Sequence, residues 1–390
     1  MKTKTEARFL LFCAGLCITA CALFLSGCNS GKENLIKVGM LATLSDDDPP
    51  TGLEMKRAAE TAMREIEAEE LKNRKIGKVK VELIIQDDYG TPETSVEAAR
   101  KLIYRDEVDA VVGPQFSSNA IPVAALAEKA GVLMLAPMST NPKTTTGKEF
   151  VFRIPFTDLL QAEAMAGFAY EDLGFSNISV LYNISDEYSR GLANQFKTIF
   201  SQIGGTVSAF VHYTYDTNKD FTNQLSRVKE QAPEALYLPN YHEDVMLQVP
   251  QARGMGIAAV MLGGDGWSDA AAAEAEGFEG SFLTRHWHPD IANAEARQVM
   301  ETYRKEYGKN PDDVFMNTYD AFSLLFRSIR EAAELTPDGL RDSIAGMDQF
   351  DGVSGTFYYE QGGDPRKQVH IIKLDSGTAR LYKTLDPGRG

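Results

Sequence analysis

Short apolar runs alternate with helical segments through most of the chain. Ile36–Leu41 and Val79–Ile85 have the length and apolar character of buried strands, and apolar residues between them recur at helical spacing. Ala110–Val112 and Val132–Leu135 are two further predicted strands with a helix between them. Strands that alternate with helices predict a mostly parallel sheet with helices on both faces and right-handed crossovers.

The same alternation begins again after Phe152-Arg153-Ile154-Pro155. Residues 293–347 are mainly helical, with one long helix predicted over Val314–Glu334, and the tail returns to strands. The predicted strands of this part are Ile178–Tyr182, Val207–Val211, Ala235–Leu238, Ala259–Gly263, Thr356–Tyr359, Val369–Leu374 and Ala379–Tyr382, with a helix over Gly191–Ile203. The chain of 390 residues therefore predicts two similar α/β halves, because domains usually hold about 150 residues.

The composition is that of a globular protein with an acidic surface. Hydrophobic residues make up 43% and charged residues 24% of the chain, which excludes a polytopic membrane protein and a disordered chain. The formal net charge is −15. Binding to a phosphate backbone needs clustered Lys and Arg, so we expect no nucleic-acid partner.

The N-terminus has the three-part pattern of a secretory signal. Lys2, Lys4 and Arg8 precede the uncharged apolar run Phe9–Leu25, and small residues precede Cys28. The pattern predicts a signal peptide over residues 1–27. The apolar run is close to the minimum length of a spanning helix, so an uncleaved anchor is the alternative.

Leu25-Ser26-Gly27-Cys28 resembles the lipobox of bacterial lipoproteins. This resemblance implies that Cys28 is acylated, becomes the new N-terminus and tethers the protein to a membrane through residues 28–34. Asn29, in place of Asp, implies the outer membrane where the host has two. Cys13, Cys17 and Cys21 leave with the signal, so the mature body holds neither a disulfide nor a cysteine zinc site.

The motifs of common enzyme classes are missing from the sequence. There is no G-x-G-x-x-G after a strand and no G-x-S-x-G, so we expect no nucleotide cofactor and no catalytic triad. His286 and His288 point to one side of an extended segment and could hold a metal, but the spacing offers no third ligand. The alternative is a strand end with polar side chains, and we expect neither a metal nor a cofactor.

Acidic residues follow the first predicted strand. Asp46, Asp47 and Asp48 lie in a loop at the carboxyl end of that strand, where open α/β sheets bind ligands. Three carboxylates there could attract a cation. Such a run of acidic residues is more often simply a solvated loop.

Hydroxyl side chains follow two neighbouring strands. Ser117 comes after the third predicted strand, and Ser139 and Thr140 come after the fourth. Hydroxyls and free N–H groups at a helix start bind a carboxylate, and the carboxyl ends of parallel strands meet at one edge. The two loops are therefore predicted to converge on one anion, with simple helix capping as the alternative.

The order of these loops resembles the periplasmic solute-binding proteins of the leucine/isoleucine/valine-binding type. The resemblance runs from about Ile36 into the tail. It implies two doubly wound α/β lobes joined by three crossovers, the type I periplasmic binding protein fold, with ligand held between the lobes. The segments that carry it are IKVGMLATLS, LIIQDD, AVVGPQFSS, APMSTNP, VFR, SVLYNISDEYSRGLA, DFTNQL, QARGMG, LGGDG and DGVSGT.

The resemblance also implies how the chain divides between the lobes. Residues 35–154 with 285–352 would form the N-terminal lobe, and residues 155–284 with 353–390 the C-terminal lobe. The crossovers would lie near Arg153–Phe156, Phe282–Arg285 and Gly352–Gly355.

Ligand-binding residues are implied by the same resemblance. The loop of Ser117 and the loop of Met138, Ser139 and Thr140 would bind a carboxylate. Tyr188 would close over the ligand from the second lobe, and Asp265 would pair with an α-ammonium group. Tyr241 and His242 match a further position in the cleft. These roles suit the chemistry of the side chains.

The sequence departs from the family pattern in three places. Thr51 stands where the first loop usually ends in an aromatic residue, Ser189 replaces a Gly after the closing Tyr, and Pro239-Asn240 replaces Gly-Gly. These changes predict an altered side-chain pocket and weaken the case for leucine, isoleucine or valine. Trp267 and Trp287 would line this pocket or, alternatively, pack in the core or at its rim.

We therefore expect a monomeric, lipid-anchored protein of the cell envelope that captures an amino acid or related carboxylate. It would present this ligand to an ABC-type membrane permease through a hinge closure, without catalysis. A sensor of the same fold that signals to a receptor kinase is one alternative. A metal-dependent hydrolase using His286 and His288 is the other.

Overall fold

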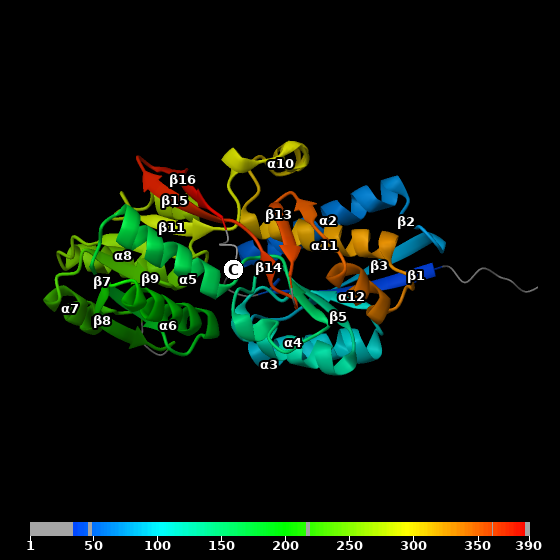
Figure 1. The fold of residues 1–390 in the computed structure, drawn as a ribbon, viewed down its shortest axis with the longest axis horizontal. Helices are drawn as coiled ribbons and strands as arrows, with labels where there is room; N and C mark the ends of the chain where they lie inside the picture. Colours follow the sequence, from blue (N-terminus) through cyan, green and yellow to red (C-terminus); the bar gives the residue numbers. More distant parts are fainter. Residues whose placement is uncertain (1–33, 46–48, 216–218, 361, 387–390) are drawn as a thin grey trace, which may run out of the picture.

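The protein folds into two α/β lobes that lie side by side along the long axis (Figure 1). A computed structural model describes residues 34–45, 49–215, 219–360 and 362–386. In Figure 1 the first lobe lies on the right with the blue, cyan and orange elements, and the second lies on the left in green and yellow. The prediction of two α/β lobes is confirmed.

A six-stranded sheet forms the centre of the first lobe, in the order β2-β3-β1-β4-β5-β6. Only the short edge strand β2 is antiparallel to its neighbour, and the other pairs are parallel. The third predicted strand coincides with β4, where all three side chains are apolar and buried. The strands span Asn34–Ala42 (β1), Lys72–Asn73 (β2), Gly77–Asp87 (β3), Ala110–Val112 (β4), Leu133–Ala136 (β5) and Val151–Arg153 (β6).

Helices cover both faces of this sheet, and its central strands β4 and β5 are apolar and buried over their full length. One face packs against α2, α10, α11 and α12, and the other against α3 and α4. The helices span Pro49–Glu69 (α2), Pro92–Arg100 (α3), Ser117–Ala130 (α4), Ala294–Tyr307 (α10), Asp313–Glu331 (α11) and Pro337–Ala345 (α12), and the π-helical turn Lys101–Arg105 extends α3.

The second lobe contains a seven-stranded sheet in the order β16-β15-β11-β10-β9-β7-β8. The five strands β8, β7, β9, β10 and β11 run parallel to one another. β15 pairs antiparallel with β11, and β16 pairs antiparallel with β15 at the edge of the sheet. The strands span Asn177–Asn183 (β7), Thr206–Tyr213 (β8), Ala235–Leu238 (β9), Val260–Gly263 (β10), Phe282–Arg285 (β11), Val369–Asp375 (β15) and Thr378–Leu385 (β16).

Helices cover this sheet in the same way. One face packs against α5 and α6 and the other against α7, α8 and α9. The helix α6 begins where Asp186 accepts a hydrogen bond from the Ser189 backbone N–H at 2.8 Å. The helices span Asp158–Gly167 (α5), Glu187–Gln202 (α6), Thr222–Glu230 (α7), His242–Gly254 (α8) and Asp269–Glu274 (α9).

A small antiparallel sheet of β12 (Phe350–Gly352), β13 (Gly355–Tyr359) and β14 (Pro365–Arg366) lies beside the first lobe. Gly352–Gly355 forms the turn of its first hairpin, and Phe350 and Phe357 pack into the first lobe's core. The chain enters the second sheet after β14, at β15. The division of the chain at residues 284–285 and 352–353 stays a prediction.

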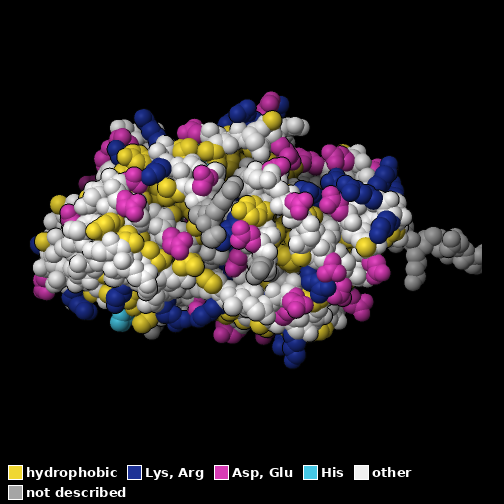
Figure 2. Space-filling view, viewed as in Figure 1, with side chains coloured by type: hydrophobic (Ala, Val, Ile, Leu, Met, Phe, Trp, Pro, Cys, Tyr) yellow, Lys and Arg dark blue, Asp and Glu magenta, His cyan; other side chains and the backbone are white. Residues whose placement is uncertain are grey.

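The described surface carries charges of both signs. On the face in Figure 2, Lys and Arg side chains are interspersed with Asp and Glu. Among the described residues, no helix combines the length and apolar character needed to span a bilayer. The predicted signal peptide, Cys28 and the Asp46–Asp48 run lie outside the described residues.

Candidate ligand-binding cleft

The two hydroxyl-bearing loops meet, as the strand order predicted. Because β4 and β5 are parallel neighbours, the residues that follow them lie at one edge of the sheet. The Ser139 hydroxyl donates to the Ser117 hydroxyl oxygen at 3.1 Å and lies 2.8 Å from that of Thr144. All three side chains are buried. The arrangement offers clustered hydroxyls to an anionic group.

A buried carboxylate faces the cleft from the second lobe. Asp265 follows β10, and one of its oxygens accepts a hydrogen bond from Gln161 at 2.8 Å and one from the Tyr188 hydroxyl at 2.9 Å. The other oxygen lies 3.0 Å from His286 Nε2. The Asp265 backbone N–H donates in turn to the Gln161 side-chain oxygen at 2.8 Å, which fixes the loop.

These partners keep Asp265 ionised in spite of its burial. Burial alone raises the pKa of Asp265. The hydrogen bond and charge of His286 lower it, and the hydrogen bonds from Gln161 and Tyr188 add to that effect. The net result is a pKa of Asp265 below its ordinary value. An ionised carboxylate in a buried cleft is a ready partner for an ammonium group.

Aromatic rings from both lobes pack around this carboxylate. The Tyr188 and Tyr241 rings are stacked, with centroids 4.9 Å apart and planes 25° apart. Phe116, at the start of α4 in the first lobe, meets the edge of Tyr241 at 5.1 Å. Burial, followed by the charge of Asp265, raises the pKa of Tyr188 well above its usual value, so its hydroxyl stays a donor. The rings supply apolar cover beside the charge.

The two departures in the second lobe contact one another. The Ser189 hydroxyl donates to the Asn240 side-chain oxygen at 2.7 Å and accepts from the Asn183 backbone N–H at 2.8 Å. Asn240 donates in turn to Gln248 and to the Leu181 carbonyl, both at 2.9 Å. Ser189 and Asn240 therefore replace the family's glycines as a pair and brace the starts of α6 and α8, which carry Tyr188 and Tyr241.

A second buried acid lies beside the hydroxyl loop. The Asp158 backbone N–H, at the start of α5, donates to the Thr140 carbonyl at 2.8 Å. Burial raises the pKa of Asp158 well above its ordinary value, and the charge of Asp265 raises it further, although the Thr140 hydroxyl acts the other way. The surroundings therefore shift the pKa of Asp158 upward and that of Asp265 downward.

Direct contacts join the lobes across the cleft. The Ser118 hydroxyl donates to Asp186 at 2.8 Å, and the Asn141 amide donates to the Glu187 carbonyl at 2.8 Å. The Lys143 ammonium lies 2.9 Å from the Glu187 carboxylate. A Cβ at Gly191 would lie 2.8 Å from the Asn141 amide nitrogen, so a larger residue there would displace this amide from its contact with Glu187. The two lobes are therefore in direct contact at these positions.

The remaining predicted site residues lie apart from this centre. Met138 is half-buried, and its sulfur accepts a hydrogen bond from the side-chain amide of Asn317 on α11 at 3.5 Å. Thr51 lies half-buried in the first turn of α2. Its role, like the ligand contacts expected of Ser117, Met138, Ser139, Thr140, Tyr188, Tyr241 and Asp265, stays a prediction.

Both tryptophans pack in cores. Trp267 meets Phe278 edge to face at 5.5 Å, and its indole N–H donates to the Leu238 carbonyl at 3.0 Å. Trp287 belongs to the first lobe's core. Both side chains therefore pack in core clusters, and a ligand contact of Trp267 stays a prediction.

Sequence reasoning missed several residues of the cleft. Gln161 gave no signal because a single amide on an otherwise apolar helix face looks like a surface residue until the helix is placed. Asp158 and Asp186 looked like helix-start acids. Sequence reasoning considered His286 as a metal ligand beside His288 or as a polar residue at a strand end, whereas its ring contacts both Asp265 and Phe156, with the Phe156 centroid at 3.9 Å.

The metal interpretation has no geometric basis in the described part of the chain. His288 interacts with Asp290, at 3.3 Å, and His286 with Asp265. No group of three or more His, Cys, Asp or Glu side chains suitable for a metal ion occurs among the described residues.

Comparison with known proteins matches nearly the whole body of the chain. A family model described as periplasmic binding protein matches residues 35–379. The Leu/Ile/Val-binding protein homolog 3 of Brucella melitensis is 30% identical over 367 residues, which cover 88% of this chain and 92% of that protein.

Solved structures show the same fold. A leucine-binding protein from Thermotoga maritima aligns with a TM-score of 0.83 and 29% identity, covering 90% of this chain and 99% of that chain. An ABC-transporter solute-binding protein from R. palustris, in complex with benzoate, aligns with a TM-score of 0.78, covering 90% of this chain and 97% of that one. At 19% identity the second likeness shows the fold alone. The chain therefore belongs to the periplasmic binding protein family, has the two-lobed type I fold, and is a solute-binding protein rather than an enzyme.

Proposed function

We propose that this protein captures a free amino acid in the cleft between its lobes and delivers it to an ABC-type membrane permease. The carrying observation is the buried Asp265 carboxylate, which accepts hydrogen bonds from Gln161 and from Tyr188, whose ring stacks on Tyr241. Its charge suits the α-ammonium group, and the hydroxyls of Ser117 and Ser139 suit the α-carboxylate. The related proteins of B. melitensis and T. maritima carry the names of branched-chain amino-acid binders, which supports this ligand class.

The buried acid favours an amino acid over a simple carboxylate such as benzoate. A ligand with no cationic group would enter a cleft that already holds an ionised Asp265, and two negative charges in a low-dielectric site repel strongly. An α-amino acid brings a positive charge to Asp265 and a negative charge to the hydroxyl loops. This match of charges supports a zwitterionic ligand.

A ligand series that separates these groups tests the proposal. Melting temperature and calorimetry would be measured with L-leucine, L-isoleucine, L-valine, L-threonine and L-alanine, and with benzoate. The controls are 4-methylpentanoate, which is leucine without its amine, and 3-methylbutylamine, which lacks the carboxylate. We expect stabilisation by at least one amino acid and none by the controls, since a ligand that binds only the folded state raises its stability. Stabilisation by the carboxylates alone would contradict the proposal.

The anchor and the permease belong to the same proposal. The lipobox-like sequence that ends at Cys28 supports export and acylation, which would hold the protein at a membrane. Deletion of the coding region should then abolish uptake of the bound amino acid in cells, and a variant with Asp265→Asn should restore it only at higher concentrations of that amino acid than the wild type needs. Normal uptake in the deletion strain would contradict a role in import.

A further inference from the structure

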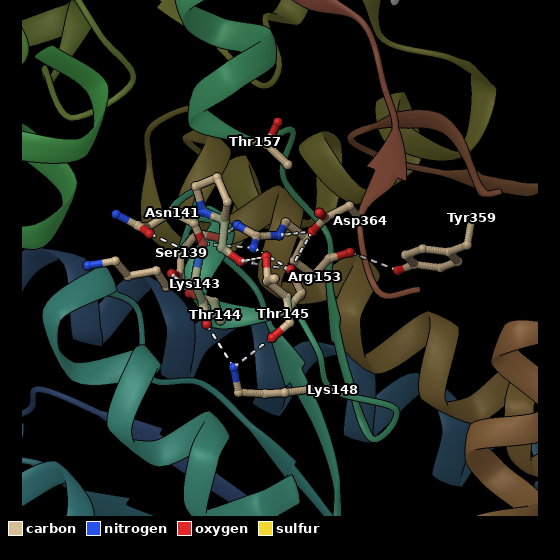
Figure 3. A network of polar contacts seen from close by, with 12 residues as sticks. Ser139, Asn141, Lys143, Thr144, Thr145, Lys148, Arg153, Thr157, Tyr359 and Asp364 are labelled. Carbon is tan, nitrogen blue, oxygen red and sulfur yellow. Dashed lines mark hydrogen bonds and ion pairs between the residues drawn. The ribbon is translucent and has the colours of Figure 1, made fainter. Parts of the chain in front are cut away.

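Arg153 makes an unusually complete set of hydrogen bonds for a side chain with 0% exposure. Its Nη1 donates to the Ser139 carbonyl at 2.8 Å, and its Nη2 donates to the Asn141 carbonyl at 2.8 Å and to the Thr145 hydroxyl at 2.7 Å. Its Nε donates to Asp364 at 2.7 Å. Figure 3 shows the guanidinium at the centre of this network, between residues 139–148 and Asp364. The planar guanidinium of arginine, with its N–H donors in fixed directions, can make this pattern of hydrogen bonds, whereas the ammonium group of a lysine cannot.

The network continues into the chain segment that leads to the second lobe. The Thr145 hydroxyl donates to the same Asp364 oxygen at 2.6 Å. The Arg153 backbone N–H donates to the Gly363 carbonyl at 2.9 Å, and the Tyr359 hydroxyl donates to the Arg153 carbonyl at 2.8 Å. Arg153 thus ends the first lobe's last strand, β6, and contacts the segment that precedes β15.

The loop that Arg153 holds is the one that reaches the ligand site and the opposite lobe. Ser139 bonds to Ser117 in the hydroxyl cluster. Asn141 and Lys143 both contact Glu187 across the cleft. The Arg153 guanidinium binds the backbone carbonyls of residues 139 and 141 in this loop. It therefore holds both the part of the loop that contacts the hydroxyl cluster and the part that contacts the opposite lobe.

We propose that Arg153, with Thr145 and Asp364, is a positioning residue for ligand binding. It fixes loop 139–145 in the binding conformation and ties that loop to the connection between the lobes. When the loop is already ordered, ligand binding does not lose free energy in ordering it. Ligand affinity therefore depends on the hydrogen bonds that Arg153 makes to the loop. This inference rests on the proposed ligand site, but the order of the loop can be measured without any ligand.

Thr145 offers the sharpest variant. Thr145→Val keeps the volume and β-branching of the side chain and removes the hydroxyl that bridges Arg153 and Asp364, whereas Thr145→Ser keeps the hydroxyl. Arg153→Lys keeps the charge but cannot make four directed hydrogen bonds. Glu360→Gln is a control for Asp364→Asn in the same segment, because exposed Glu360 pairs with Arg366 and not with Arg153.

The experiment combines amide hydrogen exchange of the unliganded full-length protein with calorimetry using L-leucine as the probe. We expect Thr145→Val, Asp364→Asn and Arg153→Lys to speed exchange in peptides from residues 139–146 by about fivefold or more, with β1 peptides unchanged. Thr145→Ser and Glu360→Gln should exchange like the wild type. Leucine affinity should fall about tenfold in the first group and stay constant in the second.

The two measurements separate failure of this inference from failure of the proposed ligand. Wild-type exchange in the Thr145→Val loop, or faster exchange spread equally over the whole chain, would overturn the positioning role. Faster local exchange with unchanged leucine affinity would overturn it as well. If wild-type protein does not bind leucine, the proposed ligand fails, and the exchange data alone decide whether Arg153 orders the loop.

Discussion

Asp265→Asn removes one negative charge from the cleft and keeps the size and shape of the side chain. The amide oxygen of Asn can still accept from Gln161 and from the Tyr188 hydroxyl, which now bond Asp265 at 2.8 and 2.9 Å. The amide group would face His286 Nε2, which can accept in its neutral tautomer. We therefore expect the folded state to survive and the loss to fall on the ligand.

The size of that loss follows from the contact removed. A hydrogen bond to a charged group contributes about 1.5–3 kcal/mol, and the ammonium of an amino acid would lose this contribution at Asp265. His286 already shares one Asp265 oxygen, so we expect a value near the middle, about 2 kcal/mol. This corresponds to affinity about 30-fold weaker. Calorimetry with the amino acid that stabilises the wild type most would measure it.

Asp158→Asn is the matched control, because it changes the same group in the same cleft. Burial raises the pKa of Asp158 well above its ordinary value, whereas the pKa of Asp265 is lowered, so Asp158 is the poorer partner for a cation. We expect its effect on amino-acid affinity to be clearly smaller than that of Asp265→Asn. Equal losses for the two variants, or no loss for Asp265→Asn, would refute the assignment of the ammonium group to Asp265.

Three further predictions concern closure, pH and the anchor. Lys143→Met should weaken ligand binding at most about fivefold by calorimetry, because the side chains of the Lys143–Glu187 pair are 63% and 30% exposed and such pairs contribute about 1 kcal/mol or less. Burial lowers the pKa of His370 to about 3 from 6.5, so the unfolded chain takes up the proton first and stability falls as pH drops below 6.5. His370→Gln should flatten that fall in urea-denaturation midpoints between pH 6.5 and 4, and an unchanged slope would contradict it. Cys28→Ala should release the protein from washed membranes, as judged by immunoblotting of the fractions, and retention would contradict lipid anchoring.

The central strands β4 and β9 were predictable because burial on both faces makes them apolar over their full length. Ala110–Val112 and Ala235–Leu238 were predicted with the bounds observed for β4 and β9. The convergence of Ser117 and Ser139 also followed from sequence, since it needs only the order of parallel strands. The bounds of these strands depend on the local pattern of apolar residues, and the meeting of the two loops depends on strand order. Both can be inferred from the amino-acid sequence.

The partners of Asp265 could not be predicted in the same way. Gln161, His286 and Tyr188 come from three separate segments, and their meeting depends on how α5, α6 and β11 pack. Trp267 shows the converse. Two residues from Asp265 it looked like a pocket residue, but the chain turns there, and its ring enters the core. Side-chain direction in loops is decided by packing, which local sequence does not carry.

Asp158 and Asp265 make different contributions to the electrostatics of the candidate site. Both are buried, and burial raises the pKa of each. The three donors around Asp265 lower its pKa by more than burial raises it. The Thr140 hydroxyl lowers the pKa of Asp158 by less than burial raises it, and the charge of Asp265 raises that pKa further. The pKa values of the two buried acids are thus moved in opposite directions, and Asp265 is the better partner for a cation. A zwitterion then places its ammonium group at Asp265 and its carboxylate among the hydroxyls. A diamine would have only one such favourable carboxylate for its two cationic groups, so the same geometry that favours an amino acid disfavours a diamine.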